Sequence, residues 1–82
     1  MFKVNDKVRC IYKRKHNIFI YGKIYTIVKI DKHLIDVKGE SNIIFRFSIR
    51  EDDDFGNTFY PEFYFPSWFD RAIPKNINIK FI

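Results

Sequence analysis

The chain has 82 residues and a formal net charge of +5, from 15 Lys and Arg against 10 Asp and Glu. This length suits a single small domain over residues 1–82; it excludes a two-domain enzyme and disfavours a deep catalytic cleft. One cysteine excludes an internal disulfide. Since no apolar run has the length of a transmembrane helix or the character of a signal peptide, we expect a cytoplasmic protein without membrane association.

The apolar residues are mainly of two kinds, β-branched and aromatic. There are 14 Ile, 10 Phe and 5 Tyr, but one Leu, one Ala and one Met. β-Branched and aromatic side chains favour strands, while the good helix formers are almost missing. The composition therefore predicts an all-β fold.

The first part of the chain predicts two strands joined by a charged loop. Apolar and polar side chains alternate over residues 7–12, with Cys10 facing inward. Residues 13–17 are charged or polar and should form an exposed loop. Residues 18–30 predict a longer strand, in which Gly22 indicates a bulge or bend. The expected outer face of this strand carries Tyr21, Lys23, Tyr25 and Lys29.

The middle of the chain predicts two further strands. Residues 34–38 form the first, and residues 39–42 the turn that follows it. Residues 43–50 alternate cleanly, and a register shift of one residue would bury Arg46 and Arg50, so the facing is strongly specified. The expected inward side chains are Ile43, Phe45, Phe47 and Ile49.

The last part of the chain is more irregular. Residues 51–57 predict an acidic turn, and residues 58–65 are aromatic but contain a proline, which indicates an edge strand or irregular cover. A Ser-Trp-Phe-Asp sequence resembles a capping box and predicts one helical or 3₁₀ turn near residues 67–72. Residues 77–81 alternate as a last strand. Five to six short strands with one helical turn are typical of a small SH3-like β-barrel.

Four short motifs support this fold through a family resemblance. F-x-x-N-D-x-V-x-C-I begins at Phe2, G-K-x-Y-T-I at Gly22, D-D-D-F-G at Asp52 and F-P-S-W-F-D at Phe65. The series is similar to that of small SH3-like β-barrel proteins of phages and prophages. In that family a glycine stands where this chain has Asn5, and Asn also accepts a left-handed conformation. The resemblance implies a phage-encoded barrel, located in the cytoplasm of a bacterial host, with no catalytic residues to carry over.

Positive charge is concentrated in the first part of the chain. Residues 1–33 hold nine Lys and Arg against two Asp. Cations interleaved with tyrosines can neutralise phosphates and stack on bases, which favours nucleic-acid binding. The alternative is a set of solvated strand faces whose lysines are enriched by A- and T-rich codons. The candidate nucleic-acid-binding residues are Arg9, Tyr12, Lys13, Arg14, Lys15, Tyr21, Lys23 and Tyr25.

Aromatic side chains are concentrated later, with eight rings in residues 55–69. Strand alternation cannot place all of them inside so small a barrel. Some should seal its open end, and the surplus should form an exposed patch suited to a protein partner or a homodimer. The candidate protein-binding residues are Tyr60, Tyr64, Trp68, Asp52, Asp53 and Asp54.

Catalytic and metal-binding patterns are missing from the sequence. Cys10 has inward parity and should be a core residue rather than a nucleophile. His16 and His33 have no second ligand at zinc spacing. On a calcium-loop template the acidic run places Phe55, which has no side-chain oxygen, at a ligand position. We therefore predict no enzymatic activity, no cofactor and no bound metal.

Three functions remain open for such a chain. The first is a non-enzymatic, phage-encoded module that binds a host or defence protein stoichiometrically, as an inhibitor. The second is a nucleic-acid-binding barrel that uses the basic first half of the chain. The third is a structural subunit of a phage particle. The sequence favours a protein partner over nucleic acid.

Overall fold

The computed structural model describes residues 2–50, 55–58 and 62–72. These ranges contain five strands, one 3₁₀ turn and one short helix. The elements in chain order are β1 (Lys7–Cys10), β2 (Ile24–Asp31), β3 (Leu34–Lys38), the 3₁₀ turn (Glu40–Asn42), β4 (Ile44–Ser48), α1 (Phe65–Trp68) and β5 (Phe69–Arg71).

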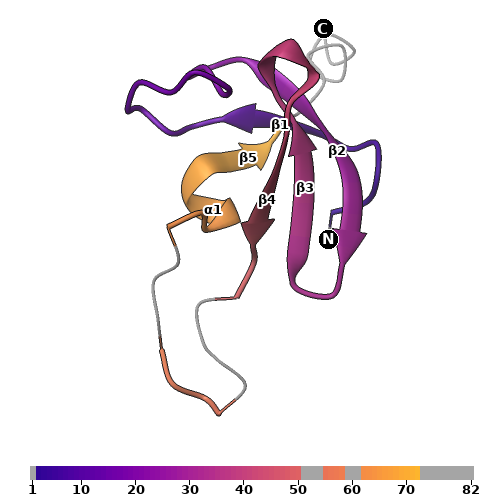
Figure 1. Ribbon diagram of the computed structural model, residues 1–82, viewed down its shortest axis with the longest axis vertical. Helices are drawn as coiled ribbons and strands as arrows, with labels where there is room; N and C mark the ends of the chain where they lie inside the picture. The colour runs from indigo at the N-terminus through magenta and orange to yellow at the C-terminus, as the bar shows by residue number, and fades with distance from the viewer. Residues whose placement is uncertain (1, 51–54, 59–61, 73–82) are drawn as a thin grey trace, which may run out of the picture.

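The five strands form one antiparallel sheet in the order β4-β3-β2-β1-β5. The first four strands follow one another as a meander, and β5 returns to pair with β1, where Val8 lies opposite both Tyr25 and Arg71. Figure 1 shows the sheet curling into a half-barrel, with α1 beside the concave face. This arrangement confirms the predicted small all-β barrel.

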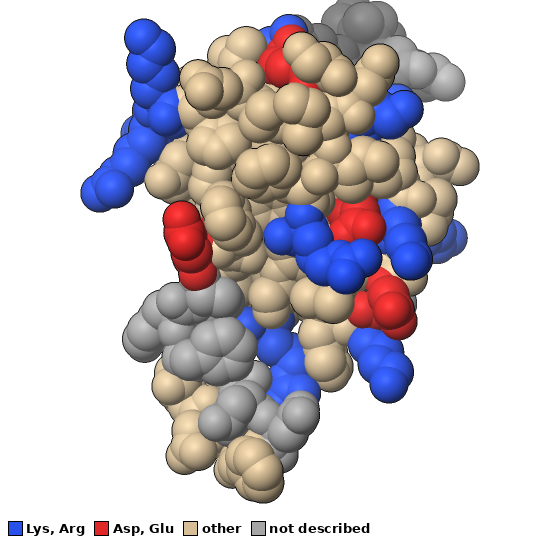
Figure 2. Space-filling view, in the orientation of Figure 1, with Lys and Arg blue, Asp and Glu red and all other residues tan. Residues whose placement is uncertain are grey.

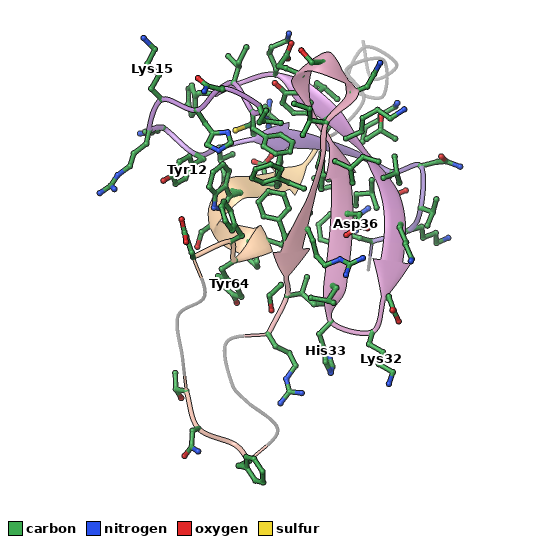
Figure 3. All side chains as sticks on the ribbon, in the orientation of Figure 1. Tyr12, Lys15, Lys32, His33, Asp36 and Tyr64 are labelled. Atoms are coloured by element: carbon green, nitrogen blue, oxygen red, sulfur yellow. The ribbon has the colours of Figure 1, made fainter. Side chains whose placement is uncertain are left out.

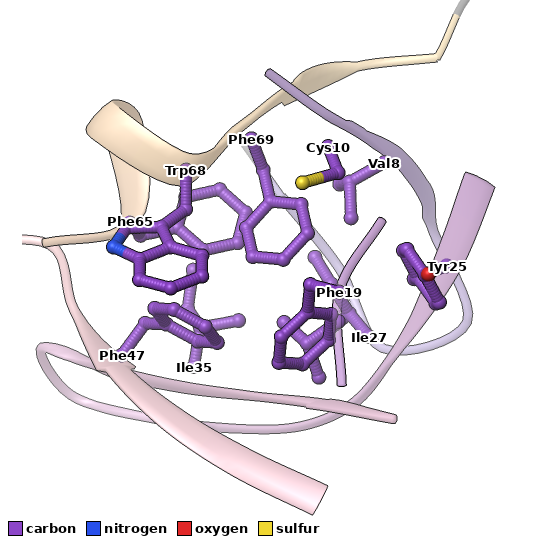
Figure 4. Packing of buried hydrophobic residues seen from close by; sticks show 11 residues of the cluster. Val8, Cys10, Phe19, Tyr25, Ile27, Ile35, Phe47, Phe65, Trp68 and Phe69 are labelled. Carbon is purple, nitrogen blue, oxygen red and sulfur yellow. The ribbon is translucent and has the colours of Figure 1, made fainter. Parts of the chain in front are cut away.

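Aromatic rings fill the interior of the half-barrel (Figure 4). The Phe47 ring meets the rings of Phe19 and Phe69 edge-on, at centroid distances of 5.5 and 5.1 Å. Edge-to-face contacts of this kind add stability beyond the area that they bury. The fully buried side chains of the core come from the strands, from α1 and from the loop before β2: Val8, Cys10, Phe19, Ile27, Ile35, Val37, Phe47 and Phe65.

Local alternation predicted three of the strands well. β3 has the predicted bounds, and β1 ends at Cys10, which is buried as expected. In β4 the predicted facing is confirmed at the centre, where Phe47 is buried. Ile43 and Ile49 are exposed instead, because they lie just beyond the two ends of β4 at the open ends of the half-barrel.

The prediction of a strand over residues 18–30 is wrong in its first half. β2 begins only at Ile24, and its facing there is reversed: Tyr25 is 7% exposed, whereas Ile24 is 49% exposed. Gly22, with φ of +85°, lies in a tight turn that interrupts the alternation, so residues before it do not set the register after it. A β-bulge between Ile27 and Lys29 then shifts the register again, so that Lys29 is exposed as predicted.

The helical turn is present but begins earlier than predicted. α1 starts at Phe65, its N-cap residue is Tyr64, and no side chain caps it, so the predicted capping box is wrong. The backbone N–H of Ser67 donates to the Tyr64 carbonyl instead. The predicted turn extended to residue 72, but the helix ends at Trp68. Residues 69–71 form β5 instead, which pairs with β1. The predicted last strand, residues 77–81, lies outside the described residues.

Candidate functional site

Residues 11–23 link β1 to β2 as a long projecting loop, here called the basic hairpin, and its tip carries the basic triplet, residues 13–15. Two backbone hydrogen bonds close its base. The Cys10 N–H donates to the Lys23 carbonyl at 2.9 Å, and the Gly22 N–H donates to the Cys10 carbonyl at 2.8 Å. The basic hairpin therefore continues the pairing of β1 with β2 rather than leaving the fold as a free loop.

Both sides of the basic triplet are attached to the core. Before it, the Tyr12 ring stacks on Trp68 with 3.7 Å between centroids and an interplanar angle of 9°. After it, the His16 ring meets Trp68 edge-on at 5.0 Å, and its Nδ1 accepts hydrogen bonds from the N–H groups of Ile18 and Phe19 at 3.1 and 3.3 Å. Phe19 is fully buried. The three cations between these anchors are thus held on an ordered loop.

The cations of the basic triplet point into solvent. Figure 3 shows Lys15 extending away from the molecule, and Figure 2 shows cationic side chains projecting at the same corner. All three residues are exposed. Within the described residues, ion pairs join other cations to acids, but none involves the triplet. Its positive charge is therefore available to an anionic partner.

An exposed aromatic ring lies at the base of the basic hairpin. Residues 20–23 form a turn in which the Lys23 N–H donates to the Ile20 carbonyl, and positive φ at Gly22 matches a type II turn. Tyr21 occupies the second position and is 57% exposed. It borders a shallow hollow of about 410 Å³ that Arg9 also lines. Asp70 lines the same hollow and forms an ion pair with Arg9, with 3.5 Å between Arg9 Nε and Asp70 Oδ1. The Tyr21 ring is thus the group at this hollow that is both exposed and able to stack.

Besides Tyr12, two more of the predicted nucleic-acid-binding residues hold the hairpin in place. The Tyr25 hydroxyl accepts a hydrogen bond from the Ile20 N–H at 2.9 Å and donates one to Glu40 at 2.8 Å. Lys23 donates to the same Glu40 oxygen at 2.8 Å. Burial raises the pKa of Tyr25 to about 12, and the Lys23 hydrogen bond lowers the pKa of Glu40. Tyr25 is therefore a core residue, which corrects its predicted place on the outer face.

The structure describes two of the predicted protein-binding residues, Trp68 and Tyr64. Trp68 is 3% exposed, so it belongs to the core and offers no surface to a partner. Tyr64 is half-buried beside the end of β4, where it bridges to Ser48. Tyr60 and the acidic residues 52–54 lie outside the described residues. Most of the described rings within residues 55–69 are buried or half-buried and seal the half-barrel, as the sequence predicted for part of this set.

The anchors of the basic hairpin were not foreseen from the sequence. Phe19 stands between two isoleucines, a local signal for burial, but its ring contacts include residues of the distant strands β4 and β5. No sequence pattern around His16 indicated that its ring would pack against the core.

Cys10 is buried as predicted, and burial raises the pKa of its thiol, which keeps it in the less reactive protonated form.

Comparison with family models, curated proteins and solved structures found no match for this chain. None of the helices that the structure describes is long and apolar enough to cross a membrane. Within the described ranges, no three or more His, Cys, Asp or Glu side chains gather in a group that could hold a metal ion. The basic hairpin is thus the feature whose geometry bears most directly on function.

Proposed function

We propose that this protein is a non-enzymatic binding module that holds single-stranded nucleic acid through the basic hairpin. The observation that carries the proposal is the ordered basic triplet, residues 13–15, which is exposed and forms no ion pair with a described acid. Lys and Arg side chains bind phosphates by releasing condensed counterions. A loop that is ordered before binding also loses less conformational entropy when it binds.

Tyr21 supports a single strand over a duplex. Its exposed ring can stack on a base. The Arg9 guanidinium lines the same shallow hollow but is paired with Asp70, so the ring is the group offered to a base there. Stacking on a side chain requires a base that is free from its own stack, as in single strands. Phosphates would contact the basic triplet while a base stacks at the other end of the hairpin.

The family resemblance supports a cellular setting for this module. Similarity of the motifs that begin at Phe2 and Gly22 to those of small phage and prophage proteins supports a phage-encoded protein that acts in the bacterial cytoplasm. As a non-enzymatic module, the protein would act stoichiometrically, with each copy bound to one site on the nucleic acid.

Salt dependence tests the proposal. Fluorescence anisotropy with a labelled mixed-sequence single-stranded DNA should give log K falling with log salt, with a slope of about −2 for three phosphate contacts. Replacing all three triplet residues by Ala should remove most of this slope and weaken binding at least tenfold. The matched control replaces three exposed lysines elsewhere, Lys3, Lys29 and Lys38, by Ala, with the same change in net charge. Equal losses in both variants would contradict a site at the hairpin.

Two pairs of single variants test the geometry without changing the formal charge. Tyr21→Ala should weaken binding about fivefold or more, while Tyr21→Phe keeps the ring and the affinity. His16→Ala should weaken binding by loosening the loop, whereas His33→Ala, in the β2–β3 turn, should not.

A duplex of the same sequence should bind more weakly than the single strand; tighter duplex binding would overturn the assignment to single strands.

A second candidate is inhibition of a host or defence protein by direct binding. It is favoured by Phe55, whose side chain is 89% exposed in the segment that also contains the predicted acidic turn. Large exposed aromatic side chains commonly anchor protein interfaces. Capture of one bacterial protein that survives replacement of the basic triplet but is lost with Phe55→Ala would favour this candidate.

A further inference from the structure

A second hollow, of about 500 Å³, lies at the end of the half-barrel that carries the β2–β3 turn. None of its lining residues belongs to the basic hairpin. Its apolar walls are formed by Phe2, Ile30, Ile35, Ile49, Phe65 and Pro66. A mostly apolar hollow of this size with few polar groups is typical of a site for a small ligand.

The hollow is preformed because its walls are packed from behind. The Phe2 ring meets the Phe65 ring edge-on at 4.9 Å, and the Arg71 guanidinium lies 4.6 Å from the centre of the Phe2 ring. Ile35 and Phe65 are buried and form the floor, while Ile49 is exposed at the rim. A ligand would therefore enter without rearranging the core.

Among the described residues that line the hollow, Lys32 alone is charged. It occupies the β2–β3 turn, and Figure 3 shows its side chain reaching out from the tip of that turn. No ion pair involves it within the described part of the chain. The flexible stem of a lysine lets the ammonium group swing over the mouth of the hollow.

The acid next to Lys32 in the chain, Asp31, also acts on the outer face of the sheet. The pKa of Arg46 is raised, first by its hydrogen bond to Asp36 and also by the charge of Asp31. Asp31 therefore contributes its charge to the cluster of Asp36 and Arg46 on the outer face of the sheet. Asp31 and Lys32 also line a neighbouring shallow hollow, but no ion pair joins them among the described residues, so the Lys32 ammonium remains at the mouth of the apolar hollow.

We propose that this hollow binds a small amphipathic carboxylate, with its aliphatic body against the apolar walls and its carboxylate beside Lys32. Charge complementarity selects an anion for the mouth, and the walls select a hydrocarbon for the interior. Each additional buried methylene should tighten binding about fourfold, from the hydrophobic free energy of one CH₂ group. This site is independent of the proposed nucleic-acid surface.

NMR titration of the full chain with decanoate tests the site. Saturable shifts should appear at Ile30, Ile35 and Ile49, and octanoate should bind about fifteenfold more weakly because it buries two fewer methylenes. Decanol, which has the same chain without the charge, should bind a few-fold more weakly than decanoate. Equal affinity for decanol, or shifts that spread over the whole surface without saturating, would overturn the proposal.

Matched variants locate the ligand. Ile49→Asp places a negative charge at the rim and should abolish decanoate binding, whereas Ile44→Asp, on the exposed face of β4, should leave it unchanged. Lys32→Gln should weaken binding about two- to fivefold, and Lys29→Gln should not. Circular dichroism checks folding; if Ile49→Asp unfolds the protein, the two lysine variants decide. Equal effects of the paired variants would refute this site.

Discussion

At the scale of single residues, Tyr25 connects three parts of the molecule through one hydroxyl group. Its ring packs edge-on against Phe19 in the core at 5.1 Å, and its hydroxyl joins the Ile20 backbone to Glu40. A buried hydrogen-bonded hydroxyl costs stability when it is removed, because its former partners lose a hydrogen bond. The same burial makes the ionisation of Tyr25 unfavourable.

Tyr25→Phe should lower the free energy of unfolding by about 1–2 kcal/mol at neutral pH. The difference from the wild type should shrink as pH rises from 10 to 12. Unfolded Tyr25 ionises near pH 10, while the folded residue, with a pKa of about 12, keeps its proton, so the wild type loses stability over this range. Urea unfolding at pH 7, 10 and 11 measures the difference. Tyr21→Phe, at an exposed ring, is the control; a difference independent of pH would contradict the prediction.

At the scale of elements, the basic hairpin and the turn before β4 meet so closely that no side chain fits between them. A Cβ added to Gly39 would lie 2.6 Å from the Ile18 carbonyl oxygen and would also contact the Ile18 side chain. The Glu40 N–H donates to that same carbonyl at 2.8 Å. The contact thus needs Gly39 for space, whereas Gly22 is needed for its positive φ and has open space around it.

These two glycines should respond differently to substitution. Gly39→Ala should cost about 1–3 kcal/mol of stability, because the backbone of Ile18 has to move. Gly22→Ala should cost about 1 kcal/mol from backbone strain, and Gly22→Asn less, because Asn tolerates the left-handed region. Gly39→Asn should be at least as damaging as Gly39→Ala. Urea unfolding of the four variants checks the order; recovery of stability in Gly39→Asn would rule out crowding as the cause.

At the scale of the whole molecule, Trp68 joins the basic hairpin to the half-barrel. Its ring stacks on Tyr12, meets His16 edge-on and packs against Phe47 in the core. The prediction of Trp68 as an interface residue is therefore replaced by a structural role. A domain of this size has little stability to spare, so one large core residue matters to the entire fold.

Trp68→Ala should lower stability by about 3–5 kcal/mol, enough to unfold much of the protein at 37 °C. Trp68→Phe should cost less because it keeps a ring in the cavity. Thermal unfolding and the dispersion of the amide NMR spectrum measure both effects. Tyr64→Ala, at a half-buried position, is the control with a smaller expected loss. A fully folded Trp68→Ala protein would show that the hairpin is not held through this ring.

Much of the candidate site could be read from the sequence because consecutive cations cannot be buried. The basic triplet was predicted to be exposed, and it is. Its anchors could not be predicted, since Tyr12 and Trp68 are far apart in the chain and meet only when β5 pairs with β1. Asn5 has a φ of +77°, in the left-handed region that Asn accepts more readily than most residues.

By itself, the sequence determined the all-β class and the places of β1, β3 and β4, because alternation of apolar and polar side chains is a local property of a strand with one buried face. Only the tertiary structure decided the start and facing of β2, the burial of Tyr25 and Trp68, and the pairing of β5. Those features depend on a turn at Gly22, a bulge and ring contacts between distant segments. Whether Tyr25 and Trp68 are buried depends on which distant segments pack against them, and the local sequence pattern does not contain that information.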